Sequence, residues 1–151
     1  MRRGHALLFA LALATACQGE HEPPGTVTAA ERPAAEVGER VEAQGRAADR
    51  VASPDAEPVA ASRQIVFGDL HTHTTFSQDA FSISLPLMGG EGAHPPADAC
   101  DYARFCAALD FWSINDHAEG VTPLHWQETK ESVRACNGAA SDPANPDLVT
   151  F

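Results

Sequence analysis

Apolar and polar positions divide the chain into three parts that predict different structures. A short apolar run covers residues 6–14, and residues 18–63 then contain almost no large apolar side chains. From Gln64 onward, β-branched and aromatic runs of strand length alternate with helical patterns. The pattern therefore predicts one α/β domain over residues 64–151, preceded by a region that cannot build a core of its own.

Strands and helices alternate along the predicted domain. Apolar runs indicate three strands, over residues 65–73, 110–114 and 147–151. Pro95 and Pro96 open a helix that we expect to reach Leu109, and a second helix begins at Thr122 and closes near Gly138. The apolar face expected for the first helix consists of Ala99, Tyr102, Phe105, Cys106 and Leu109. This order of elements is typical of a parallel sheet or barrel.

The N-terminus has the pattern of an export signal. Two arginines precede the apolar run, which is too short to span a bilayer because spanning takes about 20 residues. We expect a signal peptide over residues 1–16, with a spacing that resembles a bacterial lipoprotein signal and a lipidated Cys17. Gln18 after this cysteine resembles the signal of lipoproteins that are sorted to the outer membrane. The lipidated Cys17 would then contact the membrane on its periplasmic side. Ordinary cleavage before Cys17, and hence simple secretion, is the alternative.

Residues 17–63 predict a disordered tether. They are mostly Ala, Glu, Pro, Arg and Gly, so little apolar burial can offset the entropy lost on ordering. The stretch 34–51 favours a helix through its Ala, Glu and Arg content, but it lacks an apolar stripe with which to pack.

Charge narrows the range of partners. The chain has 21 acidic against 10 basic residues and a formal net charge of −11. Residues 64–151 hold only three of the basic residues, namely Arg104, Lys130 and Arg134. Such an acidic surface repels phosphate backbones, so we expect no nucleic-acid binding through a basic patch. The same surface suits a site that collects cations.

Candidate metal ligands follow the first two predicted strands. His71 and His73 are two residues apart, so they project to the same side of a strand and can chelate one cation. Asp79 adds an oxygen donor from the following loop, and His117 adds a third imidazole after the second strand. Asp116, beside it, is the candidate catalytic residue, suited to orienting a ligand or a water.

These residues resemble the first two motifs of the PHP (polymerase and histidinol phosphatase) superfamily. The matching strings are Gly68-Asp69-Leu70-His71-x-His73-Thr74, Ser77-x-Asp79-Ala80 and Ile114-Asn115-Asp116-His117. The fuller pattern, with Phe111-Trp112-Ser113 and Trp126-x-Glu128-Thr129, is similar to the DUF3604 branch.

The resemblance implies a distorted (β/α)7 barrel that holds up to three Zn, Mn or Fe ions and hydrolyses a small-molecule or phosphoester substrate with metal-activated water. It places His71, His73, Asp79 and His117 at ligand positions, with Asp116 beside the last of them. The Glu expected after the third strand, and the later His and Asp ligands, are not in the sequence. We therefore expect residues 64–151 to be the N-terminal third of such a barrel, and this fragment alone to be inactive.

Two other functions are compatible with the same residues. An amidohydrolase also carries Asp-x-His-x-His after its first strand, but it is expected to use a bridging Lys and lacks the Asp-His pair at the second strand. A non-catalytic, metal-binding surface lipoprotein is the other alternative.

The remaining polar and aromatic residues have ordinary structural interpretations. Ser77 reads as a loop hydroxyl, because no Gly-x-Ser-x-Gly elbow surrounds it. Trp112 and Trp126 are predicted to be packing residues. His94 and His125 are expected to face solvent.

Three cysteines lie in the predicted domain, and an exported domain meets an oxidising compartment. Cys100 and Cys106 would be separated by about 9 Å of rise in one helix, which is too far for a bridge. Cys136 must then pair with one of them. We expect Cys106 to be the partner, because it lies on the predicted apolar face.

Overall fold

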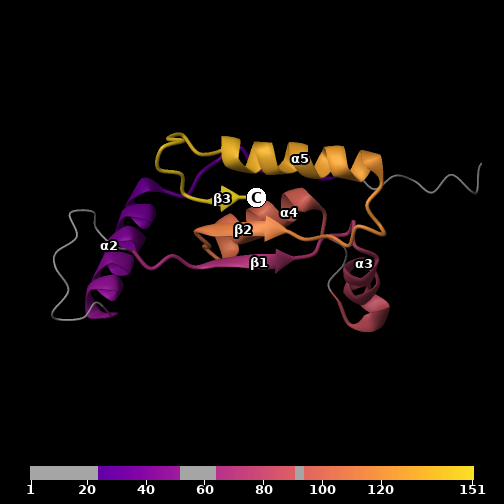
Figure 1. Ribbon diagram of the computed structural model, residues 1–151, viewed down its shortest axis with the longest axis horizontal. Coiled ribbons are helices and arrows are strands. Elements are labelled where there is room, and N and C mark those ends of the chain that lie inside the picture. Colours follow the sequence, from indigo (N-terminus) through magenta and orange to yellow (C-terminus); the bar gives the residue numbers. More distant parts are fainter. Residues whose placement is uncertain (1–23, 52–63, 91–93) are drawn as a thin grey trace, which may run out of the picture.

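The computed structural model describes residues 24–51, 64–90 and 94–151 (Figure 1). The signal peptide expected over residues 1–16 and the lipidated Cys17 lie outside these ranges, so both stay predictions. Within the described ranges, no helix is both long and apolar enough to cross a membrane.

Three parallel strands form the sheet of the domain, and their order in space follows their order in the chain. β1 (Gly68–Thr72) pairs with β2 (Phe111–Ile114), and β2 pairs with β3 (Val149–Thr150). The predicted α/β class and the parallel strands are confirmed, although each strand is shorter than its apolar run. The described residues form three adjacent strands and no closed barrel, so the (β/α)7 barrel stays a prediction.

Two helical segments connect the strands. The first is α4 (Pro96–Asp101), which continues into the π-helical turn η2 (Tyr102–Cys106). The second is α5 (Pro123–Gly138), where the Thr122 side chain accepts a hydrogen bond from the His125 N–H and caps the helix. Both helical segments contribute to one buried cluster with the sheet, made of Cys100, Ala103, Trp112, Cys136 and Leu148. The two connections therefore pack on the same face of the sheet.

The buried face of the first helical segment differs from the predicted one. Tyr102 is 66% exposed and Phe105 is 43% exposed. The segment instead packs through a mostly small-residue face, made of Pro96, Ala97, Cys100, Ala103 and Arg104. Small side chains let the backbone approach α5 closely, whereas the sequence criterion favoured the largest apolar residues.

The disulfide joins Cys100 to Cys136. The expectation that Cys136 pairs with a cysteine of the first helix is confirmed, but the choice of Cys106 is wrong. Cys106 is a free, exposed thiol. Cys100 is fully buried on the side that meets α5.

The prediction of a disordered tether over residues 17–63 is wrong for residues 24–51. α2 (Ala34–Val51) forms the helix that its composition favours, and it contacts the domain near the amino ends of the strands (Figure 1). Polar contacts replace the missing apolar stripe. Arg40 Nε lies 2.8 Å from Asp110 Oδ1, and Gln44 Nε2 donates to Asp110 Oδ2 at 2.7 Å.

A buried ion cluster ties the segment before α2 to the core. The Arg32 backbone N–H and Arg104 Nε both donate to Asp147 Oδ2, each at 3.0 Å. Arg104 Nη2 also donates to the Cys136 carbonyl at 2.7 Å. All three charged residues of this cluster are at most 6% exposed. Residues 24–33 therefore form part of the fold, because their Arg32 completes a buried charge network.

Candidate metal centre

The first half of the candidate site lies where β1 ends. The pairing of β1 with β2 is irregular between Asp69 and Thr72, and irregularities of this kind re-aim neighbouring side chains. The imidazoles of His71 and His73 converge, with their Nε2 atoms 3.1 Å apart. The pair predicted from the two-residue spacing is therefore brought together in the fold.

The second half comes from the segment after β1 and the segment after β2. Asp79 lies in the first turn of α3 (Gln78–Ser84), which the 3-10 turn η1 (Pro86–Met88) follows. Asp79 Oδ1 lies 3.4 Å from His73 Nδ1, and Asp79 Oδ2 lies 3.2 Å from His117 Nε2. Donor atoms of His73, Asp79 and His117 all lie within 4.8 Å of one another. Three of the four predicted ligands thus form one donor cluster at the carboxyl edge of the sheet, and His71 lies next to His73 outside that cluster.

Exposure and charge at the site favour a cation. The side chains of Asp79 and His117 are 48% and 54% exposed, so an ion can reach them from solvent. The Ala80 N–H donates to the Asp79 carboxylate and lowers its pKa. Desolvation opposes this shift, whereas a hydrogen bond from His73 and the charges of His117 and His73 add to it. Asp79 is therefore held in the anionic form that a metal ligand needs.

The donor spacing fits a small divalent ion. Donor atoms at 2.0–2.1 Å from a tetrahedral Zn²⁺ lie about 3.3 Å apart. The separations of 3.4 Å between His73 Nδ1 and Asp79 Oδ1 and of 3.2 Å between Asp79 Oδ2 and His117 Nε2 are close to that edge length. Mixed imidazole and carboxylate donors are also typical of Zn, Mn and Fe sites. His73, Asp79 and His117 therefore suit the metals that the sequence implies.

Asp116, the predicted catalytic residue, bonds to the turn that follows His73. Its carboxylate accepts hydrogen bonds from the Thr74 N–H and Oγ1, both at 2.7 Å, and from Ser77 Oγ at 2.8 Å. These bonds hold the turn that follows His73, and none of them joins Asp116 to a metal-donor side chain. The role predicted for Asp116, orienting a ligand or a water, stays a prediction, and its hydrogen bonds hold the turn that connects His73 to Asp79.

Two buried polar residues that the sequence pattern does not predict to be functional adjoin the site. Thr74 is 2% exposed and Ser77 is fully buried, although Ser77 had the pattern of an ordinary loop hydroxyl. The only signal in the sequence is their place between two ligands, one residue after His73 and two residues before Asp79.

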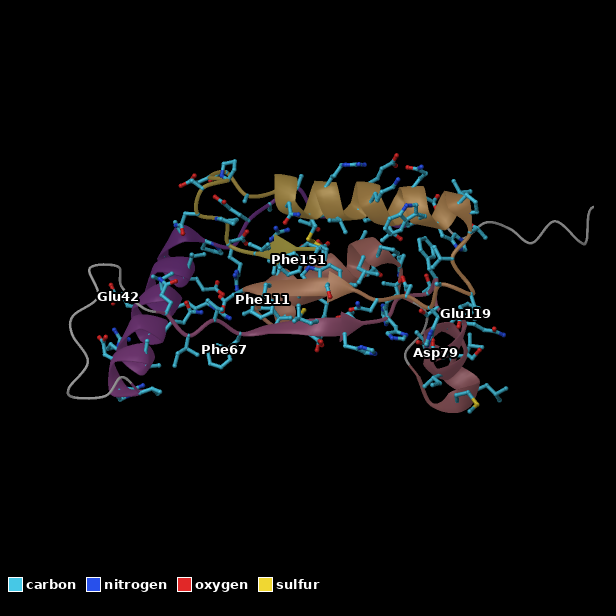
Figure 2. The ribbon with its side chains drawn as sticks, in the orientation of Figure 1. Glu42, Phe67, Asp79, Phe111, Glu119 and Phe151 are labelled. Atoms are coloured by element: carbon cyan, nitrogen blue, oxygen red, sulfur yellow. A yellow bond between two sulfur atoms is a disulfide. The ribbon has the colours of Figure 1, made fainter. Side chains whose placement is uncertain are left out.

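The other candidate acidic and histidine residues lie either at the site or away from it. Glu119 Oε2 lies 3.9 Å from His117 Nδ1, and Figure 2 shows Glu119 near Asp79 at this end of the molecule. His94 is exposed and lies 3.7 Å from Asp98, as expected for a surface residue. The expectation that His125 faces solvent is wrong, because its ring stacks on Phe76 at 4.2 Å.

The two tryptophans differ in their surroundings. Trp112 is 1% exposed and belongs to the core, as predicted. Trp126 is 55% exposed, with Lys130 Nζ 5.4 Å from its ring centroid, so its prediction as a packing residue is wrong.

A shallow hollow of about 470 Å³ opens at the site. Its lining includes two of the candidate donors and the acidic Glu119, together with neighbouring polar residues: Gln78, Asp79, Ser82, His117, Glu119 and Gly120. A hollow of this size holds a small molecule beside the donor atoms.

Comparison with known proteins yields no family model, no curated protein and no solved structure that matches this chain. The resemblance to the PHP superfamily therefore rests on the motif residues alone and stays a prediction.

Proposed function

We propose that this chain carries the first metal ligands of an exported, metal-dependent hydrolase of the PHP type, which acts on phosphoesters. The observation that carries the proposal is the convergence of His71, His73, Asp79 and His117, from three separate segments, at one edge of a parallel sheet. Donor atoms of His73, Asp79 and His117 lie within 4.8 Å of one another, a spacing that one divalent cation can bridge, and His71 lies next to His73.

The residues of this chain have distinct parts in the proposed reaction. A bound divalent ion supplies polarisation of a phosphoryl oxygen and lowers the pKa of water to about 7. His71, His73, Asp79 and His117 hold that ion. Glu119, 87% exposed and 3.9 Å from His117, is placed to accept a proton at the rim. The polar hollow beside Asp79 admits the substrate.

The topology supports a larger barrel of the same kind. Strand order follows chain order, and both connecting helices share one core on one face of the sheet, which is the arrangement that (β/α) barrels repeat. Large apolar side chains along the sheet also stay exposed among the described residues, as expected if further strands cover them: Val66, Phe67, Leu70 and Phe151.

Metal binding without turnover is the second candidate for the 151-residue chain itself. The Asp79 and His117 side chains are about half exposed, and water competes with a substrate at so open a site. The resemblance implies up to three ions, whereas the described residues bring together donors for one ion. We therefore expect these 151 residues to bind metal and to lack phosphoesterase activity.

Elemental analysis of protein purified without chelator tests the metal part of the proposal. We expect a transition metal in the purified chain, and loss of most of it in the double variant His71→Ala/His73→Ala, because two imidazoles disappear together. His94→Ala is the matched control, since His94 is exposed and pairs with Asp98 instead of a candidate ligand. Unchanged metal content in the double variant would place the site elsewhere.

The proposed export depends on Cys17, and fractionation tests it. If Cys17 is lipidated, Cys17→Ser moves the protein from the detergent-soluble membrane fraction to the aqueous fraction, because the lipid is its proposed anchor. Equal partitioning of both forms leaves simple secretion as the export route.

A further inference from the structure

The turn between His73 and Asp79 is more deeply buried than the donors that flank it. Thr74, Phe76 and Ser77 are at most 4% exposed, whereas the Asp79 side chain is 48% exposed. Two hydroxyl groups are therefore buried directly beneath a solvent-facing cluster. A buried hydroxyl without a partner is costly, so its hydrogen bonds show what it holds.

The Ser77 hydroxyl joins two consecutive residues at the end of β2. Its Oγ donates to Asp116 Oδ1 at 2.8 Å and accepts from the His117 N–H, also at 2.8 Å. A serine hydroxyl has one hydrogen to donate and lone pairs to accept, so both bonds form at once. Thr74 adds its own N–H and Oγ1 to the same Asp116 carboxylate, both at 2.7 Å.

These bonds connect the backbone segments that carry His73, Asp79 and His117, the three donors that lie nearest one another. His73 directly precedes Thr74, Asp79 follows Ser77 by two residues, and His117 is bonded to Ser77 through its backbone. The ring of His125 on α5 stacks on Phe76 at 4.2 Å and fixes the middle of the turn. The donor atoms are thus set by a hydrogen-bonded clamp that contains no donor side chain.

We propose that Thr74 and Ser77 are positioning residues, which hold His73, Asp79 and His117 at metal-binding distances before an ion arrives. This inference rests on the proposed function, because the ion is the ligand that reports on the positioning. Removing the Thr74 hydroxyl takes the hydrogen bond from Asp116 Oδ2, and removing the Ser77 hydroxyl takes one of two bonds from Asp116 Oδ1 and the acceptor of the His117 N–H. Either change lets the turn move against β2. Groups that orient metal ligands typically change metal affinity 10- to 100-fold when they are lost.

Zinc titration of the full chain tests the clamp. We expect Thr74→Val and Ser77→Ala to weaken Zn²⁺ binding about 10- to 100-fold and to alter the visible absorption spectrum of the Co²⁺-loaded protein. Thr74→Ser keeps the hydroxyl and restores both. Thr150→Val is the matched control, because Thr150 is equally buried at 4% exposed and its hydroxyl donates to Cys136 Sγ, away from the site. Melting temperatures are measured in parallel for every variant.

The outcomes separate this inference from the proposed function. Wild-type affinity in Thr74→Val, or an equal loss in Thr150→Val, overturns the positioning role and leaves the metal site standing. If the wild-type chain binds no Zn²⁺, the proposed function fails, and amide hydrogen exchange of the metal-free protein then decides the clamp. In that case faster exchange at the His117 N–H in Thr74→Val than in Thr150→Val supports the clamp, and equal exchange overturns it.

Discussion

Two polar clusters lie at opposite ends of the parallel strands, and they differ in the burial and pairing of their charges. At the amino end, Asp147 is buried between Arg32 and Arg104, and every charge there has an opposite charge beside it. At the carboxyl end, the donors of the candidate metal centre are partly or largely exposed and face one another. A buried charge must be paired within the protein, whereas an exposed cluster of like donors is free to bind an ion. The comparison separates a cluster that stabilises the fold from one that is suited to function.

The largest expected effect comes from removing the segment that completes the amino-end cluster. A chain that begins at residue 64 loses Arg32 and α2, so Asp147 and Asp110 lose their partners from the N-terminal segment. We expect it to be insoluble or molten, without a cooperative thermal transition. A chain that begins at residue 24 is the control and should keep that transition. A cooperative transition in the shorter chain would show that the segment is dispensable.

Single substitutions at the two ends of the strands compare their effects on stability and on metal binding. Asp147→Asn leaves two buried guanidinium groups without their counter-charge, and we expect the free energy of unfolding to fall by about 3–5 kcal/mol in a urea titration. Asp79→Asn, at the carboxyl end, should leave the melting temperature unchanged while metal binding weakens. Similar losses of stability in both variants would mean that the two clusters do not differ in role.

The disulfide, like the amino-end cluster, is expected to stabilise the fold. Replacing both Cys100 and Cys136 by Ala removes the bond between α4 and α5, and we expect a loss of about 2–4 kcal/mol of unfolding free energy. Cys106→Ala is the control and should have little effect, because that thiol is free and exposed. Peptide mapping without reduction should recover Cys100 joined to Cys136, and a Cys106–Cys136 peptide would contradict the fold described above.

The smallest expected effect is a dependence of stability on acid pH at the amino end. Burial would raise the pKa of Asp110, but hydrogen bonds from Arg40, the Phe67 N–H and Gln44 outweigh it and hold the pKa below its ordinary value of 3.8. Because the folded-state pKa of Asp110 is lowered, its ionised carboxylate stabilises the protein at pH values above the ordinary pKa. This stability is lost as the pH falls through the folded-state pKa. Arg40→Gln should therefore reduce the stability near neutral pH by up to about 1 kcal/mol and make the acid decline shallower. Parallel urea titrations from pH 2 to pH 7 measure both slopes, and identical slopes would exclude Asp110 as their source.

Local patterns in the sequence determined the elements and the members of the candidate site. The order of the strands and of the two connecting helices follows from apolar periodicity and from the prolines that open α4 and α5, which act within a few residues. The expectation that Asp79 lies in a loop is wrong, because it lies in the first turn of α3. His71 and His73 could be paired from sequence because a strand alternates its side chains every residue. Parallel strands then predict that residues following β1 and β2 meet at one edge, and Asp79 and His117 do so.

Only the tertiary structure decided which groups are buried and what each one contacts. Cys100 rather than Cys106 reaches Cys136 because the helix packs through its small residues, and no periodicity of large apolar residues shows this. The ordering of residues 24–51 likewise depends on ion pairs with Asp110 and Asp147, far away in sequence. The sequence predicts an ordinary loop hydroxyl at Ser77, whereas the structure places this hydroxyl at the centre of the clamp. Its partners lie about 40 residues away in the chain. Contacts of this kind depend on how whole elements pack, so the sequence pattern around one residue does not determine them.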